Sequence, residues 1–110
     1  MTIWAVEPEN AAILSGGSVG THLQMGIGDG LIPDILNTQI YDHIQIVTDE
    51  EALQTAKDLA RLEGLMCGIS SGSNVAAAQK LAKKLGKGKT VVTILPDTAE
   101  RYFSTPLFED

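Results

Sequence analysis

Serine and glycine residues cluster in one short stretch of the chain, just before a helix-forming segment. Residues 64–73 read Gly-Leu-Met-Cys-Gly-Ile-Ser-Ser-Gly-Ser, and the helical pattern continues to Leu85. An apolar strand that enters such a turn brings backbone N–H groups and hydroxyls together at a helix start, where the helix dipole favours acceptor groups. On pattern alone, a simple helix cap by Ser71 or Ser73 is the more frequent explanation. The neighbouring segments decide whether the stretch binds a ligand.

The other reactive residue types indicate neither metal nor thiol chemistry. Cys67 is the single cysteine and lies in an apolar run, so we expect a buried, inert thiol. One cysteine cannot form an internal disulfide, which fits a reducing compartment and predicts a cytoplasmic protein. His22 and His43 are far apart in the sequence and lack the spacing of a metal site.

The composition excludes two classes of partner. The chain has 110 residues, a formal net charge of −6 and only five aromatic residues, and its lysines alternate with apolar residues. This pattern argues against nucleic acid as the main partner. No apolar run is long enough to span a membrane. The length is sufficient for one domain with a core of its own.

Apolar periodicity predicts an α/β chain with a mainly parallel sheet and flanking helices. We expect strands near residues 2–6, 44–47, 65–69 and 90–95, and helices near residues 49–63 and 72–85. The first helix should begin at a capping box, Thr48 to Glu51, and end at Gly64. These elements predict a single α/β domain over residues 1–110. The first strand is apolar on both faces and has no preceding element to cover it, so we expect a portion of a longer protein.

Two glycine clusters lie in the loop-rich region between the first two expected strands. They cover residues 15–20 and 26–30. The second cluster lacks the third glycine of a dinucleotide-binding fingerprint, and Leu31-Ile32-Pro33 does not continue as a helix, so a Rossmann site is excluded. Glycines of this kind form turns or let the backbone approach another group closely.

Five segments together resemble cysteine synthase, the pyridoxal-phosphate-dependent O-acetylserine sulfhydrylase. They occur in the order and spacing of this family and are Val6–Pro8, Leu14–Gly17, Gly26–Pro33, Gly68–Gly72 and Glu100–Thr105. The resemblance covers essentially the whole chain but only the C-terminal part of the family's longer members. It implies a tryptophan-synthase-β-like fold and pyridoxal 5'-phosphate as the cofactor of the full-length enzyme.

The resemblance also assigns roles to four residues. Ser70 matches the family's serine that meets the pyridine nitrogen of the cofactor. Gly26 belongs to the segment that lines the exposed side of the cofactor, and Pro96 and Asp97 match residues near the ring nitrogen. A hydroxyl leaves this nitrogen neutral, which suits β-elimination and β-replacement. The family's catalytic lysine lies upstream, so the resemblance implies no catalytic residue in this chain, and we expect no activity from it alone.

The resemblance implies synthesis of cysteine from O-acetylserine, or another activated serine, and sulfide. Cysteine synthases commonly have a serine where Asp97 stands, whereas the related cystathionine β-synthases have an aspartate, so the same part of such an enzyme is an alternative. A second alternative is a non-catalytic binding or oligomerisation module. Because strand 2–6 would be uncovered, we expect self-association, as a homodimer or a larger assembly.

Overall fold

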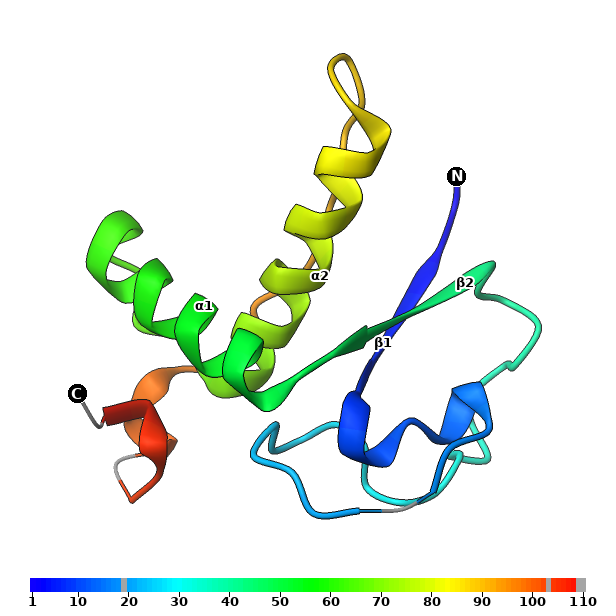
Figure 1. Ribbon diagram of the computed structural model, residues 1–110, viewed down its shortest axis with the longest axis horizontal. Helices are drawn as coiled ribbons and strands as arrows, with labels where there is room; N and C mark the ends of the chain where they lie inside the picture. Colours follow the sequence, from blue (N-terminus) through cyan, green and yellow to red (C-terminus); the bar gives the residue numbers. More distant parts are fainter. Residues whose placement is uncertain (19, 103, 109–110) are drawn as a thin grey trace.

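The structure is a computed structural model that describes residues 1–18, 20–102 and 104–108 (Figure 1). Its strands are β1 (Trp4–Pro8) and β2 (His43–Val47), and its α-helices are α1 (Asp49–Glu63) and α2 (Ile69–Leu85). Four short 3-10 helices complete the order: η1 (Glu9–Ala11), η2 (Ile13–Ser15), η3 (Ala99–Tyr102) and η4 (Pro106–Phe108). Within these ranges, no helix is long and apolar enough to cross a membrane.

Strands β1 and β2 pair in parallel, as expected. The register runs from Trp4 opposite His43 to Pro8 opposite Val47, so both strands end at the same edge of the sheet. The rings of Trp4 and His43 stack with their centroids 4.3 Å apart. Helix α2 contacts both strands and also α1, and the two α-helices lie on one side of the strand pair (Figure 1). The predicted α/β class is confirmed.

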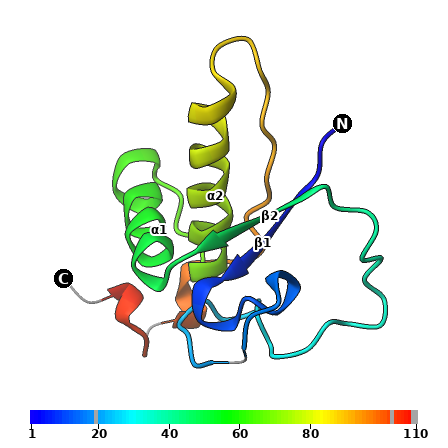
Figure 2. The same cartoon turned by 45° about the vertical axis from the view of Figure 1, so that its right-hand side comes forward.

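The expected strands at 65–69 and 90–95 were wrong as predictions. Cys67 forms only an isolated antiparallel bridge with Thr98, and residues 90–95 run as an extended trace beside α2 without a ladder (Figure 2). Val92 and Ile94 are 84% and 69% exposed. A strand needs a neighbouring strand to pair with its backbone N–H and C=O groups. No described segment forms a ladder with residues 65–69 or with residues 90–95.

Helix α1 begins and ends where its sequence predicts. The Thr48 hydroxyl accepts a hydrogen bond from the Glu51 backbone N–H at 3.1 Å, and the Glu51 carboxylate accepts one from the Thr48 N–H at 3.3 Å. Gly64 closes the helix with φ +71°, a conformation that glycine adopts without strain. Glu51 also forms an ion pair with Lys80 of α2. This pair ties the first turn of α1 to the middle of the next helix.

Helix α2 begins three residues earlier than expected. Its first residue is Ile69, and its N-cap is Gly68, with no side-chain cap. The prediction of a strand ending at 69 and a cap by Ser71 or Ser73 was therefore wrong, because all the serines of the cluster lie inside the helix. Ser70, Ser71 and Ser73 are buried in its first turns.

Small residues allow α1 and α2 to approach closely. Ala52 and Ala56 of α1 are buried, as expected from the spacing of apolar residues in this helix, and so are Ala76 and Ala77 of α2. At Gly72, a Cβ atom would overlap the backbone oxygen of Ala52 and lie 2.9 Å from the backbone nitrogen of Ala56. The backbones touch where α2 has no side chain, and this contact fixes the first turns of α2 against α1.

We expect Gly72→Ala to lower the free energy of unfolding by about 3 kcal/mol, because the new methyl group meets rigid backbone. This loss should exceed the gain from alanine's better helix propensity. Gly64→Ala is the control, since Gly64 is left-handed, with φ +71° and ψ +19°, and has no atom within 4 Å of an added Cβ. It should cost only about 1 kcal/mol of backbone strain. Urea unfolding measures the free energy of unfolding of each variant. If both variants lost the same amount, the close contact at Gly72 would be contradicted.

The Glu51 ion pair predicts a small acid-sensitive part of the stability. Burial alone would raise the pKa of Glu51, but hydrogen bonds from Lys80 and Thr48 and the charge of Lys80 hold it below the ordinary value of 4.5. The stabilisation is therefore complete above pH 4.5 and is lost as the pH falls through the lower pKa of the folded state.

Glu51→Gln should remove this acid-sensitive part, worth at most about 1 kcal/mol for a partly exposed pair. Glutamine still suits a capping box, so the variant changes the charge and keeps the cap. Thermal unfolding across the acid range measures the effect. Equal pH dependence of the variant and the parent chain below pH 4.5 would contradict this assignment.

Candidate functional site

Two of the sequence-predicted segments meet at the start of α2. The Gly68 backbone N–H donates to the Asp97 carbonyl oxygen at 3.2 Å, so Pro96 and Asp97 lie beside the first turn of the helix. Ser70 is in that turn and is 4% exposed. An added Cβ at Gly68 would overlap Asp97 Oδ1, so only glycine fits between the helix start and this carboxylate.

The two carboxylate oxygens of Asp97 have different surroundings. The hydroxyl of buried Tyr102 donates to Oδ2. Oδ1 is buried and has no hydrogen-bond partner within the described residues. A buried acceptor without a partner is costly, so this side of the helix start is suited to a ligand that supplies a hydrogen-bond donor. The sequence motif contained Tyr102, but only the structure places its hydroxyl on Asp97.

The Gly26–Gly30 loop lies at the edge of the sheet where both strands end. Gly26, Gly28 and Gly30 have φ values of +94°, +63° and +86°. A Cβ on Gly28 would be 2.6 Å from the ring of Pro8, the last residue of β1. A cavity of about 180 Å³ opens between this loop and β1. Ligand sites of α/β proteins occur at the carboxyl ends of parallel strands, which is where this loop lies.

Gln24 anchors the loop, and its side chain is fully buried. Its amide nitrogen donates to the Val47 carbonyl oxygen at 2.9 Å and to Asp49 Oδ1 at 3.1 Å. Its amide oxygen accepts from the Ser73 hydroxyl at 2.7 Å. One side chain thus joins the loop to the end of β2, the start of α1 and the first turns of α2. Sequence analysis missed Gln24 because its partners are 23 to 49 residues away along the chain.

His22 closes the loop from the other side. Its Nδ1 accepts the backbone N–H of Gln24 at 3.0 Å, and its Nε2 lies 2.9 Å from the Gly28 carbonyl oxygen. Because Nδ1 is an acceptor, Nε2 carries the proton and donates it to Gly28. His22 is therefore a neutral structural histidine. No group of three metal-ligating side chains occurs in the part of the chain that the structure describes.

A buried carboxylate holds the first glycine cluster. Glu7 of β1 is 4% exposed and accepts three hydrogen bonds. They come from the Leu14 N–H at 2.9 Å, the Ser15 N–H at 3.0 Å and the Ser15 hydroxyl at 2.6 Å. Several donors to one carboxylate offset the cost of its burial. Glu7 thereby fixes the loop that follows β1, and this loop lines the same cavity as the Gly26–Gly30 segment.

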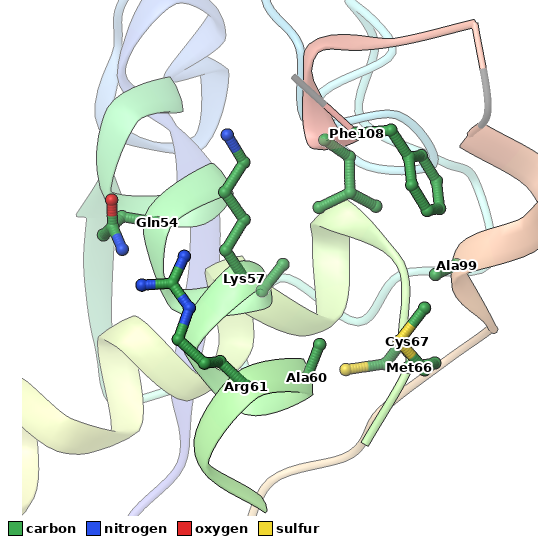
Figure 3. Close-up of a pocket in the computed structure, with 10 residues that line it drawn as sticks. Gln54, Lys57, Ala60, Arg61, Met66, Cys67, Ala99 and Phe108 are labelled. Carbon is green, nitrogen blue, oxygen red and sulfur yellow. The ribbon is translucent and has the colours of Figure 1, made fainter. Parts of the chain in front are cut away.

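A larger cavity of about 480 Å³ lies elsewhere, between α1 and the C-terminal segment (Figure 3). Lys57 and Arg61 come from α1, and Cys67, Ala99 and Phe108 line other parts of its wall. None of the four sequence-predicted cofactor contacts lines it. Burial raises the pKa of the Cys67 thiol, although the nearby Ser71 hydroxyl partly offsets this rise. The expectation of a buried, unreactive thiol agrees with this environment.

Comparison with known proteins identifies the family. A family model described as "Pyridoxal-phosphate dependent enzyme" matches residues 1–97. The chain belongs to this family. The resemblance to cysteine synthase is confirmed by the relatives that follow, and with it the expected fold class.

Cysteine synthases are among the similar proteins. The chain is 52% identical over 106 residues to "Cysteine synthase" of Staphylococcus aureus strain Mu50, covering 96% of this chain and 34% of that protein. It is 53% identical over 106 residues to "Cysteine synthase B" of Campylobacter jejuni, covering 96% of this chain and 35% of that protein. The chain thus spans about a third of the length of these curated relatives.

Solved structures of the family share the fold. Cysteine synthase from Entamoeba histolytica superposes with a TM-score of 0.95 at 42% identity, covering 99% of this chain and 32% of that one. An O-acetylserine-dependent cystathionine β-synthase from Helicobacter pylori gives a TM-score of 0.90 at 39% identity, with coverage of 98% and 35%. The arrangement of these 110 residues is therefore that of one third of a larger family member.

The contacts of His22 predict one tautomer. We expect the neutral form with the proton on Nε2, because Nδ1 accepts the Gln24 N–H. Nitrogen-15 chemical shifts of the imidazole ring at neutral pH distinguish this form from its alternative. His43, which stacks on Trp4, serves as an internal reference in the same spectrum. A proton on Nδ1 of His22 would mean that the loop is held differently.

Proposed function

We propose that this chain is the C-terminal portion of a pyridoxal-phosphate-dependent enzyme that makes cysteine from O-acetylserine, or another activated serine, and sulfide. The observation that carries the proposal is that the start of α2 is bonded to both other segments: Gly68 bonds to Asp97, and Ser73, one turn after Ser70, bonds to Gln24 at the base of the Gly26–Gly30 loop. The names of the relatives support the same activity. We further propose that residues 1–110 form a single α/β domain of this cytoplasmic enzyme.

Four residues of this chain would hold the cofactor: Ser70, Gly26, Pro96 and Asp97. When bound, pyridoxal phosphate supplies the electron sink for β-replacement. The buried Ser70 hydroxyl fits the ring-nitrogen end of this cofactor, because a hydroxyl can donate to the neutral nitrogen. The unpartnered Asp97 Oδ1 is an acceptor and would bind a donor elsewhere on the ligand. Gly26, which has no side chain, would let the backbone approach the exposed side of the ring. We assign no catalytic residue to this chain.

Asp97 supports a second candidate reaction. A carboxylate at this position is typical of the cystathionine β-synthases, which are related to the cysteine synthases, and one solved relative is an O-acetylserine-dependent cystathionine β-synthase. In that case the same four residues would bind the same cofactor, and a thiol-bearing amino acid would replace sulfide as the second substrate. Product analysis with sulfide and with homocysteine distinguishes the two reactions.

We also propose that the protein self-associates, as a homodimer or a larger assembly, and acts on small molecules rather than on nucleic acid or a membrane. Several large apolar side chains are exposed, including Leu62, Val92 and Ile94. Contiguous apolar surface marks an interaction site, and here either a second copy or the rest of the longer protein would cover it. A non-catalytic oligomerisation module remains the alternative, in which this surface would be the functional feature. Light scattering measures the mass of the assembly. A protein that stays monomeric would contradict both the self-association of the enzyme and the oligomerisation module.

A chimaeric enzyme tests the proposed activity. The matching third of Staphylococcus aureus cysteine synthase is replaced with this chain, and sulfide-dependent cysteine formation is measured. We expect the chimaera to be active and the isolated 110-residue chain to be inactive, since none of its six lysines lies in a context like that of the family's catalytic lysine. An inactive but folded chimaera that binds no cofactor would contradict the proposal.

In the same chimaera, Ser70→Asp should retain the cofactor, shift its absorbance and lower kcat at least tenfold, the loss that about 1.4 kcal/mol produces. A carboxylate at this position would favour a protonated ring nitrogen, which changes the electron sink. Ser104→Ala is the control, because Ser104 is an exposed serine outside the proposed site. Unchanged absorbance and turnover in Ser70→Asp would exclude Ser70 as the ring-nitrogen partner.

A further inference from the structure

A single buried hydrogen bond joins the two segments that we assign to the cofactor site. The Ser73 hydroxyl donates to Gln24 Oε1 at 2.7 Å. Ser73 lies about one helical turn after Ser70, and Gln24 precedes Gly26 by two residues. The bond therefore runs directly between the first turns of α2 and the base of the Gly26–Gly30 loop.

Both partners of this bond are fully enclosed. Gln24 and Ser73 are each 0% exposed. The amide nitrogen of Gln24 uses its hydrogens on Val47 and Asp49, so the amide cannot turn over without losing these bonds. The orientation of the amide oxygen toward Ser73 is thus set by β2 and α1. In a buried, fully bonded network of this kind, each hydrogen bond fixes geometry as well as adding stability.

We propose that Gln24 and Ser73 are positioning residues that hold the Gly26–Gly30 loop at a fixed place relative to Ser70, and thereby set the width of the cofactor site. This inference rests on the proposed function. Neither residue is assigned a contact with the cofactor. They act through the residues that we do assign, Gly26 on the loop and Ser70 on the helix.

The hydrogen bonds around Gln24 allow the positioning of the loop to be distinguished from a general contribution to stability. Removing the Ser73 hydroxyl leaves the Gln24 amide nitrogen bonded to Val47 and Asp49, and leaves the Leu23 N–H bonded to Asp49 Oδ2 at 3.0 Å. The loop would stay attached to the end of the sheet but lose its direct bond to α2. We therefore expect a local loosening between loop and helix, with the contact of α1 and α2 at Gly72 intact.

Hydrogen exchange on the cofactor-free 110-residue chain tests the proposal. In Ser73→Ala, backbone amides of residues 24–28 should exchange about tenfold faster, because Gln24 Oε1 is left without its donor. Amides in the middle of α1 should exchange at the parent rate. A uniform increase across the loop and both helices would show a general structural role and overturn the proposal, as would no increase at all.

Ser71→Ala is a matched control. Ser71 is also a serine in the first turns of α2 and is 0% exposed, but its hydroxyl lies near Cys67 and is not bonded to Gln24. It should leave exchange in the loop unchanged. Ser73→Cys provides a graded variant of similar size with a weak donor, and its exchange rates should fall between those of the serine and alanine forms. Equal loosening by Ser71→Ala and Ser73→Ala would contradict the proposal.

The chimaeric holoenzyme supplies the second measurement. Ser73→Ala should shift the absorbance or fluorescence of the bound cofactor and raise its Kd several-fold, and Ser71→Ala should do neither.

The positioning role and the proposed function fail in different ways. Loss of the exchange difference overturns the positioning role whatever the enzyme does. An inactive parent chimaera that binds no cofactor overturns the proposed function, even where the exchange result is as expected. If hydrogen exchange in the loop becomes faster but the cofactor spectra and Kd are unchanged, the loop position does not affect the cofactor site, and the proposed link between them is wrong.

Discussion

The absence of a side chain at Gly72 is the constraint on which the rest of this structure depends. A Cβ at this position would overlap the backbone of α1 at Ala52, so the two helices approach as closely as they do only because it is missing. Their contact brings the start of α1, at Asp49, near the first turns of α2, at Ser73. Gln24 bonds to both of these residues. A wider separation of the helices would break one of the two bonds, and the loop would then be held to β2 and to only one of the helices through Gln24.

Polar side chains take over the role of regular structure in the long connection between the strands. Most of residues 12–42 form no strand or α-helix, so their backbone groups need other partners. Such partners are supplied by three side chains that bond to the backbone of the glycine loops and the segments beside them: Glu7, His22 and Gln24. The loops can then contain glycines with positive φ, which leave the backbone uncovered by side chains. The order of this region comes from a few buried polar groups rather than from an apolar core.

Local sequence determines some of these elements and leaves others open. Helix α1 was predictable because its capping box and Gly64 lie within the helix and its immediate flanks. The strands at 65–69 and 90–95 were wrongly predicted, because apolar periodicity shows that a segment is suited to a sheet but not that a partner strand is present. Helix α2 begins early despite serines and a glycine in its first turns, since contact with α1 outweighs their low helix propensity. Ser70 was singled out only by the resemblance, and the role of Gln24 depends on partners distant in the sequence.

The extended segment beside α2 has a consequence for solubility. Residues 90–95 are rich in β-branched and apolar side chains, and their backbone groups are free of any ladder, so the segment is a template for stacking with identical chains. Lys83, Lys84, Lys87 and Lys89 precede it closely. Stacking in register would bring each of these charges against its own copy, and this repulsion opposes fibril growth. The lysines at the end of α2 and in the turn after it therefore oppose stacking of this extended apolar segment, and high salt should weaken that protection by screening the charges.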